Sequence, residues 1–267
     1  MLSTRVDYDA IAEHYDRSPH RKKSPDSELV VLLAEHGPAT DLSLLDIACG
    51  TGNQLVANRT IAPDAFIAGI DGSLGMLRQA RRKAADIAWV HGDSAALPFA
   101  TGSFDFASCQ YAFHHFRDQA GMLREAFRVL RGGGRFAMSN LSPQDMPDFI
   151  YYPYFPEAQE RDLADFWLAE RIATEMRSVG FADVMLKREH RRFDHSLADF
   201  LETVRRRENN SQLITLSDAA YVAGLAAIER DIADPGRPST RPDHLCFVTI
   251  RGDKRVGCGD ETKGEKP

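Results

Sequence analysis

Strand-length apolar runs alternate with segments of helical period from residue 42 to about residue 190, and this alternation restricts the possible folds more than any other feature of the sequence. Such alternation is typical of βαβ units, in which helices cover both faces of a parallel sheet. The sequence therefore predicts an α/β fold with a doubly wound, Rossmann-like sheet. The expected strands span residues 42–48, 65–71, 87–92, 104–110, 135–140, 182–193 and 244–252.

Helix start and stop signals separate these strands. Ser73 is a typical N-cap for the helix between the second and third strands. The apolar positions in 123–130 repeat with a helical period, and the glycine-rich segment 131–134 is expected to end that helix before the fifth strand begins. A later helix is expected to end near Gly180.

The N-terminal flank and the segment after the fifth strand have their own patterns. Residues 1–37 are predicted to form capping helices, because the apolar and tyrosine side chains from Tyr8 to Tyr15 repeat at i, i+3, i+4 and i+7. Residues 142–159 are rich in proline and tyrosine and are expected to form a loop, one with too many aromatic residues to be a simple linker.

A helical insertion is expected between the last two strands, at residues 196–240, where it would cover the substrate. Ser196 and Ser217 each precede an amphipathic pattern and have an acid shortly after them, as helix starts prefer. The remaining chain is predicted to divide into a core of residues 38–195 and 241–254 and a charged, disordered tail at 255–267.

Composition limits the partners of the chain. Its 267 residues carry a formal net charge of -6 and a pI of about 5.9, so the molecule would repel a nucleic-acid backbone. The N-terminus lacks the apolar core of a signal peptide, and no segment reaches the roughly 20 apolar residues of a membrane span. We expect a cytoplasmic monomer or homodimer without nucleic-acid or membrane partners. The four cysteines show no metal-site spacing, which predicts free thiols and no metal.

The segment LLDIACGTGN, residues 44–53, places two glycines directly after the first expected strand. In an open α/β sheet, ligands bind beyond the carboxyl ends of the strands, and the turn containing Gly50 and Gly52 lies there. Without side chains, this turn lets a ligand approach the backbone. Glycines in a tight turn can also serve the turn alone, so both explanations stay open.

Acidic residues at the ends of neighbouring strands favour a ligand with an adenosine part. Asp71 follows Gly52 by 71 − 52 = 19 residues, close to the spacing of roughly 20 at which an acid binds ribose hydroxyls. Asp93 can accept the exocyclic amine of adenine, with the Ser94 amide beside a ring nitrogen. Asp46 would repel a diphosphate but can pair with an α-amino group. The predicted ligand carries an adenosine at one end and an amino acid at the other.

Four segments together resemble a known family: LLDIACGTGNQ, GIDGSLGML, GDSAALPFATGSFDFASCQYAFHHF and VLRGGGRFAMSN. Their order and spacing are similar to the class I S-adenosylmethionine-dependent methyltransferases, particularly the ubiquinone/menaquinone-biosynthesis-like branch that acts on small molecules. The resemblance covers residues 5 to about 141 and becomes faint from 142 to 240. It implies a seven-stranded sheet whose last strand is antiparallel.

The resemblance also implies S-adenosyl-L-methionine as cofactor and S-adenosyl-L-homocysteine as product. It assigns Asp46, Ala48, Gly50 and Gly52 to the methionine part, with Thr51 along the same turn, Asp71 to the ribose, Gly72 and Met76 to the flank of the adenine, Asp93 and Ser94 to its edge, and Gln110 to the backbone next to the sulfonium. The insertion at 196–240 is larger than the short hairpin of many family members, so their substrates do not transfer directly to this chain.

Methyl transfer from a sulfonium is an in-line displacement, which needs alignment first and a base only when the acceptor carries a proton. His114 and His115 are the candidate bases, and a packing role for this pair is the alternative. Tyr8 and Tyr15 are candidates to cover the bound molecules. Tyr152 and Trp167 are candidate walls for an apolar acceptor, although all four aromatics can equally be packing residues.

Two functions from different classes follow. The leading hypothesis is a methyltransferase that acts on a small-molecule acceptor. The alternative is a catalytically silent nucleoside-binding or regulatory module that contacts protein or RNA. A nicotinamide dehydrogenase is disfavoured, because Leu55 stands where the third glycine of the dinucleotide motif belongs.

Overall fold

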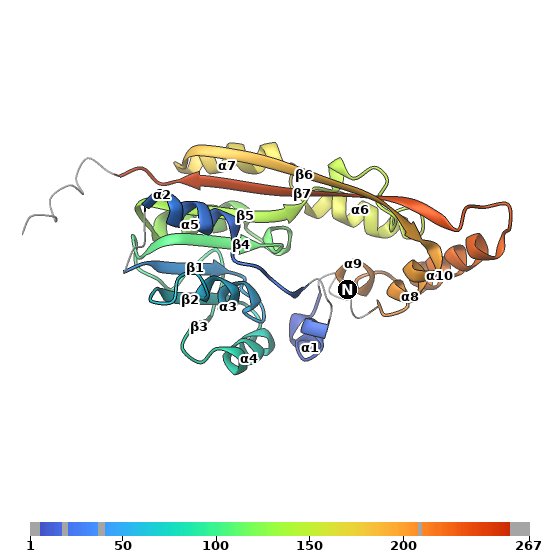
Figure 1. Cartoon of the computed structure of the whole chain (residues 1–267), viewed down its shortest axis with the longest axis horizontal. Helices are drawn as coiled ribbons and strands as arrows, with labels where there is room; N and C mark the ends of the chain where they lie inside the picture. Colours follow the sequence, from blue (N-terminus) through green and yellow to red (C-terminus); the bar gives the residue numbers. More distant parts are fainter. Residues whose placement is uncertain (1–5, 18–20, 37–40, 208–209, 257–267) are drawn as a thin grey trace, which may run out of the picture. The chain divides into compact units, whose positions relative to one another are not determined.

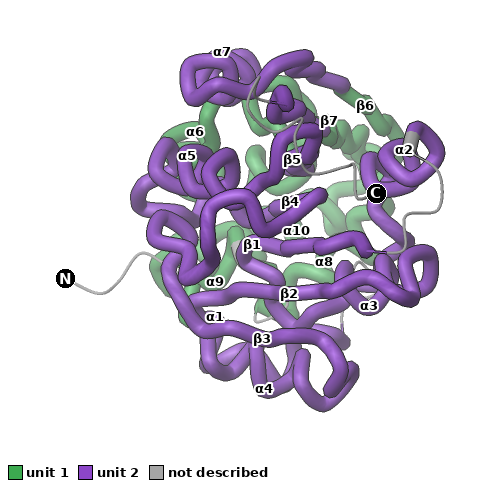
Figure 2. Tube along the Cα trace, turned by 90° about the vertical axis from the view of Figure 1, so that its left-hand side faces the viewer, with its two compact units in different colours: residues 1–7, 141–168, 188–248 green, residues 8–140, 169–187, 249–267 purple. Residues whose placement is uncertain are grey.

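The computed structural model describes residues 6–17, 21–36, 41–207 and 210–256 (Figure 1), and these divide into two compact units (Figure 2). Unit 2 comprises residues 8–140, 169–187 and 249–267, and unit 1 comprises residues 1–7, 141–168 and 188–248.

Seven strands form one sheet in the order β3-β2-β1-β4-β5-β7-β6. The pairs β1–β2, β1–β4, β2–β3 and β4–β5 are parallel, which confirms the predicted doubly wound arrangement. The strands are β1 (Ser43–Ile47), β2 (Phe66–Asp71), β3 (Ala88–His91), β4 (Phe104–Gln110), β5 (Leu130–Leu141), β6 (Ala182–Ser196) and β7 (Thr240–Asp253).

The predicted antiparallel last strand is also confirmed. The Gly133 amide donates to the Lys254 carbonyl at 2.6 Å, and the Lys254 amide donates to the Gly134 carbonyl at 2.8 Å. Farther along, the Ser142 amide donates to the Cys246 carbonyl at 2.9 Å. Residue numbers therefore fall along β7 and its continuation as they rise along β5 and its continuation, which is the antiparallel pattern. The glycines at 132–134, expected to stand before the fifth strand, are part of β5, because they pair with the chain that follows β7.

The helices of unit 2 follow the predicted signals. Ser73 caps α4 by accepting a hydrogen bond from the Met76 amide, and Gly180 ends α7 with a φ of +120°. The helix expected from Tyr8 to Tyr15 is shorter than its apolar pattern, because α1 ends at Ile11 and a separate 3-10 turn follows. The elements are α1 (Tyr8–Ile11), η1 (Tyr15–Arg17), α2 (Ser27–His36), α3 (Asn53–Arg59), α4 (Leu74–Lys83), η3 (Phe113–His115), α5 (Gln119–Val129) and α7 (Ala169–Val179).

A buried cluster joins α2, α3 and α4 to the sheet. Every residue of β1 is buried, as expected for a central strand covered on both faces. The cluster contains Leu29, Leu32, Leu44, Cys49, Leu55, Ala62, Ala65, Ile67, Leu77, Ala80, Ile87, Trp89, Phe106 and Ala137. This packing holds the carboxyl ends of β1, β2 and β4 in fixed positions, which a binding site requires.

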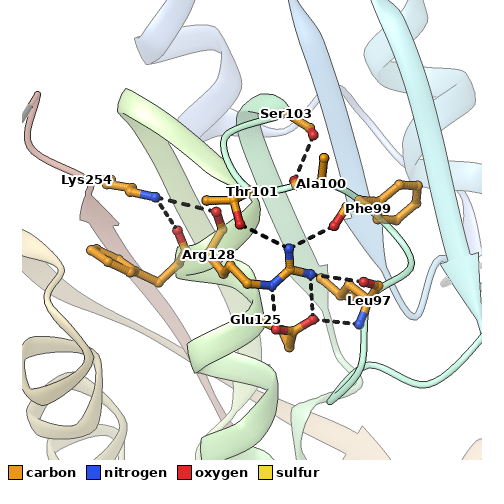
Figure 3. Close-up of polar contacts among 9 residues, drawn as sticks. Leu97, Phe99, Ala100, Thr101, Ser103, Glu125, Arg128 and Lys254 are labelled. Carbon is orange, nitrogen blue, oxygen red and sulfur yellow. Dashed lines mark hydrogen bonds and ion pairs between the residues drawn. The ribbon is translucent and has the colours of Figure 1, made fainter. Parts of the chain in front are cut away.

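Helix α5 fixes the segment that follows β3 (Figure 3). The guanidinium of Arg128 donates to the carbonyls of Leu97 and Phe99 at 2.9 and 2.8 Å. Glu125 accepts from the Leu97 amide at 2.7 Å and pairs with Arg128 at 2.7 Å. These contacts tie the backbone of residues 97–99 to the helix.

Unit 1 has its own core. Ser196 and Ser217 cap α8 and α10, as predicted, by accepting hydrogen bonds from the amides of Asp199 and Ala220. The elements are η4 (Pro143–Asp145), α6 (Pro156–Asp165), α8 (Leu197–Val204), α9 (Ser211–Ile214) and α10 (Asp218–Ala233). The core cluster contains Ile150, Tyr154, Phe155, Ala158, Leu197, Phe200, Leu201, Val204, Leu213, Leu216 and Ile228.

Segment 142–159 has too many aromatic residues for a simple linker, and in the structure most of these side chains are buried and α6 begins within the segment. Phe155 packs so closely on α10 that a Cβ at Gly224 would lie 2.1 Å from its ring. The segment therefore shares a core with the helices of 196–240, and the two form one unit with residues 188–195. This grouping differs from the predicted division into a core and a separate insertion.

Within the described ranges, every helix is too short or too polar to span a bilayer. Cys49, Cys109 and Cys246 are buried free thiols, and Cys258 lies outside the described residues. The N-terminal residues 1–5 and most of the predicted tail, residues 257–267, also lie outside them.

Candidate functional site

The turn after β1 adopts left-handed backbone conformations at Ala48, Gly50 and Gly52, with φ of 60°, 55° and 79°. Its two glycines differ in their surroundings. A Cβ at Gly52 would lie 2.4 Å from Cη2 of Trp89, whereas a Cβ at Gly50 would have no heavy atom of the described residues within 4 Å apart from Gly50 itself and its two chain neighbours. Gly52 is therefore required by packing, and Gly50 presents bare backbone to open space.

Asp71, at the end of β2, connects this turn to helix α4. Its Oδ2 accepts from the Gly50 amide and its Oδ1 from the Ser73 amide, both at 2.8 Å. Burial raises the pKa of Asp71, while the two amide hydrogen bonds lower it. Each carboxylate oxygen keeps a further lone pair for a ligand hydroxyl.

Asp46 lies deeper, on β1, with 2% of its surface exposed. The Ser108 hydroxyl on the neighbouring strand donates to Asp46 Oδ1 at 2.8 Å. Burial raises the pKa of Asp46 to about 7; the Ser108 hydrogen bond opposes this rise and the nearby charge of Asp26 adds to it. The carboxyl group therefore changes charge near neutral pH.

The predicted adenine contacts lie after β2 and β3. Asp93 is exposed, and its Oδ1 accepts from the Ala95 amide at 2.9 Å. Ser94 follows it and is half-buried. Gly72 is exposed, whereas Met76 is buried within α4. The His91 ring nitrogen Nε2 lies 3.1 Å from the Gly72 carbonyl, so the ends of β2 and β3 are joined here.

Two acids of the N-terminal segment reach this site, and sequence reasoning missed both. Asp9 accepts from the Gly75 amide at 2.5 Å and from the Ser73 hydroxyl at 3.1 Å, at the N-terminus of α4. Asp16 accepts from the Thr51 hydroxyl at 2.7 Å and pairs with Lys83 at 2.5 Å. A small acid in a polar segment carries no specific signal, so only the fold could reveal these partners.

Tyr8 and Tyr15 directly precede these two acids in the chain. The Tyr8 hydroxyl is 2.7 Å from Nε2 of His115, and the rings of Tyr8 and Tyr15 meet edge to face at 6.2 Å. Burial raises the pKa of both phenols, so both stay neutral at physiological pH. Arg21 stacks on Tyr15 at 3.9 Å from the ring centre. The N-terminal segment thus contacts the turn after β1, helix α4 and the loop after β4.

His114, in the same loop, is held by Asn140 at the end of β5. The Asn140 amide nitrogen lies 3.3 Å from His114 Nδ1. Burial and the neighbouring His115 ring lower the pKa of His114 well below its ordinary value, so the ring is neutral. With Nδ1 accepting from the Asn140 amide, the proton of the neutral ring resides on Nε2.

The end of β4 carries a further polar group. Gln110 donates to Asp26 at 2.6 Å, and Asp26 also caps α2 by accepting from the Glu28 amide. Lys23 places its ammonium 4.4 Å above the ring of Tyr111, whose φ is 57°. Sequence reasoning missed Lys23 and Asp26, because neither belongs to a motif.

The predicted site residues fall into two groups. The cofactor candidates, both histidines, Tyr8 and Tyr15 all belong to unit 2. The acceptor candidates Tyr152 and Trp167 belong to unit 1. Tyr152 is buried in that unit and donates to Asp162 at 3.1 Å, whereas Trp167 is half-buried. A contact of either aromatic with an acceptor remains a prediction.

Comparison with known proteins places residues 45–138 in a family described as "Methyltransferase domain". The demethylmenaquinone methyltransferase of Thermus thermophilus is 36% identical over 118 residues, which are 42% of this chain and 54% of that protein. The chain spans about half the length of the curated relatives it matches.

Solved structures share the fold at low identity. A protein of Anabaena variabilis described as "Putative methyltransferase from antibiotic biosynthesis pathway" superposes with a TM-score of 0.65 at 18% identity, covering 87% of this chain and 99% of that one. The phosphoethanolamine N-methyltransferase 2 of Haemonchus contortus, solved with phosphomonomethylethanolamine and S-adenosylhomocysteine, has a TM-score of 0.59 at 18% identity, covering 96% of this chain and 61% of that one.

Proposed function

We propose that this chain, whose residues 45–138 match the family described as "Methyltransferase domain", is a class I S-adenosylmethionine-dependent methyltransferase that transfers a methyl group from S-adenosylmethionine to a small-molecule acceptor. The family assignment confirms the resemblance drawn from the sequence motifs, most of which lie inside the matched region.

The contact between Asp71 and the open side of Gly50 carries this proposal. The Asp71 carboxylate lies 2.8 Å from the Gly50 amide, and a Cβ at Gly50 would meet no described atom within 4 Å apart from Gly50 itself and its two chain neighbours. A ligand can therefore meet bare backbone and an acid at one place, as a nucleoside with an amino acid tail requires. The buried acid Asp46 on the neighbouring strand supplies a partner for the ammonium of that tail.

The cofactor would supply an electrophilic methyl group on its sulfonium, and the residues of this chain would hold and orient it. Binding energy spent on alignment lowers the barrier of such a displacement more than any single catalytic side chain does. In this assignment the turn Ala48–Gly52 and Asp46 hold the methionine part, Asp71 the ribose, Gly72, Met76, Asp93 and Ser94 the adenine, and Gln110 lies beside the sulfonium.

The two histidines would have different roles at the acceptor. His114 is neutral with its proton on Nε2, so it would donate a hydrogen bond to an acceptor oxygen and would not remove a proton from it. His115 contacts the Tyr8 hydroxyl at 2.7 Å, so it would hold the N-terminal segment over the bound molecules. A base is unnecessary when the acceptor arrives ionised.

Binding and transfer are tested separately. Isothermal titration of the full chain with S-adenosylhomocysteine should give a dissociation constant in the micromolar range or below. Incubation with a labelled methyl donor and a cell extract should then label the small-molecule fraction. The first defined acceptor to try is demethylmenaquinone, after the name of the Thermus thermophilus relative.

Each outcome bears on the proposal. Absence of binding at millimolar ligand would reject it. Binding without transfer would favour the catalytically silent module, and label in protein or RNA would favour a macromolecular acceptor. Cytoplasmic location and a monomeric or homodimeric state remain predictions from the sequence.

A further inference from the structure

Lys23 stands in a polar segment that crosses the carboxyl ends of β1 and β4. The side-chain amides of Asn53 and Gln54 donate to the carbonyls of Arg21 and Ser24, both at 3.0 Å. At the end of the segment, Asp26 accepts from Gln110 at 2.6 Å. The backbone on both sides of Lys23 is therefore fixed to the turn after β1 and to the end of β4.

The Lys23 ammonium is held without being neutralised. It lies 4.4 Å from the centre of the Tyr111 ring, a contact that attracts a cation but leaves its N–H groups free for other partners. Among the residues that the structure describes, no carboxylate forms an ion pair with it. Burial lowers its pKa, and the charges of Asp46 and Asp26 oppose that shift. An anionic ligand that pairs with this partly buried ammonium would therefore stabilise its charged form.

The neighbouring acids define where that ligand would lie. The charges of Asp26 and Asp71 both raise the pKa of Asp46, and burial raises the pKa of all three carboxyl groups. An amino acid carries its ammonium and its carboxylate on the same carbon. If Asp46 binds the ammonium, the carboxylate comes to the same region, where uncompensated acids would repel it.

The charge of Lys23 acts on Asp46 and lowers its pKa. Two other cations, one on α4 and one in the same segment, have different partners. Lys83 is paired with Asp16 at 2.5 Å, and Arg21 stacks on Tyr15 at 3.9 Å.

We propose that Lys23 binds the carboxylate of the cofactor's amino acid part and thereby sets the position of the sulfonium relative to Gln110. The assignment rests on the proposed function, because it requires a ligand with that carboxylate. It makes Lys23 a recognition residue for the amino acid tail, and Tyr111 the residue that holds the ammonium in place.

The test compares two ligands in two variants by isothermal titration of the full chain. The ligands are S-adenosylhomocysteine and its decarboxylated analogue, which keeps the amine and lacks the carboxylate. Lys23→Met removes the charge and keeps the length of the side chain. Lys22→Met removes an exposed lysine next to it and is the matched control.

We expect Lys23→Met to bind S-adenosylhomocysteine about 10- to 100-fold more weakly than wild type, the range for loss of a charge-assisted hydrogen bond. Its affinity for the decarboxylated analogue should stay within about twofold, which also shows that the variant is folded. Lys23→Arg should restore part of the loss, and Lys22→Met should bind both ligands like wild type.

Three results would overturn the assignment: equal losses for both ligands, no loss for either, or a carboxylate-dependent loss in Arg21→Ala that Lys23→Met lacks. A failure of the proposed function looks different, because the wild-type chain would then bind neither ligand.

Discussion

Gly52 lies directly against the indole of Trp89, so that a Cβ at residue 52 would be 2.4 Å from the ring atom Cη2. Two residues away, Gly50 faces open space. The two glycines of one motif are thus required for different reasons, one for packing of β3 against the turn and one for approach of a ligand.

The glycines should therefore respond differently to alanine. In Gly52→Ala the clash with Trp89 adds to a left-handed φ of 79°, and we expect a loss of about 2 to 5 kcal/mol in the free energy of unfolding. In Gly50→Ala only the φ of 55° is unfavourable, so the loss should be about 1 to 2 kcal/mol, with cofactor binding reduced at least tenfold. Urea unfolding and titration calorimetry measure the two quantities.

A combined variant controls for the clash. Trp89→Leu vacates the space that the indole occupies, so Gly52→Ala should cost less in that background than in wild type. Equal stability losses in Gly50→Ala and Gly52→Ala would contradict the separation of the two roles.

The strands could be predicted from the sequence because they follow local patterns, and the cofactor candidates were chosen from local patterns too and stay predictions. β4 was expected at residues 104–110 and lies at Phe104–Gln110, and the caps at Ser73 and Ser217 form as expected. An apolar run between glycines indicates a buried strand directly, and a serine before an amphipathic pattern indicates a helix start. Neither inference needs knowledge of distant contacts.

The missing parts of the site depend on contacts between distant residues. Asp16 meets Thr51 across 35 positions and Gln110 meets Asp26 across 84. An isolated Asp or Lys in a polar segment does not indicate its partner, so these residues could not be distinguished from solvated surface. The same holds for segment 142–159, whose aromatics pack on helices that follow about fifty residues later.

Asp71→Asn should weaken cofactor binding by about 10- to 100-fold, because the amide replaces one of two charged acceptors and loses its charge-assisted hydrogen bonds to the ribose. It should also lower the free energy of unfolding by about 1 to 3 kcal/mol, since either the Gly50 or the Ser73 amide would face an NH2 group. Calorimetry with S-adenosylhomocysteine and urea unfolding measure these effects. Asp64→Asn, at an exposed acid before β2, should change neither, and an unchanged affinity in Asp71→Asn would reject the ribose assignment.

Asp46 should make the stability of the protein fall as pH rises toward 7. Its pKa of about 7 in the folded state lies above the ordinary value of 3.8, so the folded protein holds a proton that the unfolded chain has lost between these pH values. Relative to high pH, protonation of Asp46 adds its full amount to the free energy of unfolding below about pH 4. This added stability declines between about pH 4 and pH 7, and above about pH 7 it no longer changes with pH. Asp46→Asn lacks this titration.

Urea unfolding of wild type and Asp46→Asn at several pH values between 4 and 8.5 isolates the effect from other titrating groups. The stability of Asp46→Asn relative to wild type should rise by up to about 4 kcal/mol across this range. A difference that stays flat with pH would show that Asp46 is ionised in the fold throughout.

Tyr8→Phe should loosen the N-terminal segment, because it removes the hydroxyl that lies 2.7 Å from His115 and leaves the ring contact with Tyr15 in place. The free energy of unfolding should fall by about 0.5 to 1.5 kcal/mol, the usual contribution of one hydrogen bond. If the segment covers the bound cofactor, the dissociation rate of S-adenosylhomocysteine should rise severalfold, measured by competition in stopped flow. The matched control is Tyr15→Phe, which removes a neighbouring hydroxyl but keeps both the ring that packs on Tyr8 and the contact between Tyr8 and His115. A dissociation rate equal to wild type in Tyr8→Phe would assign this hydrogen bond to packing alone.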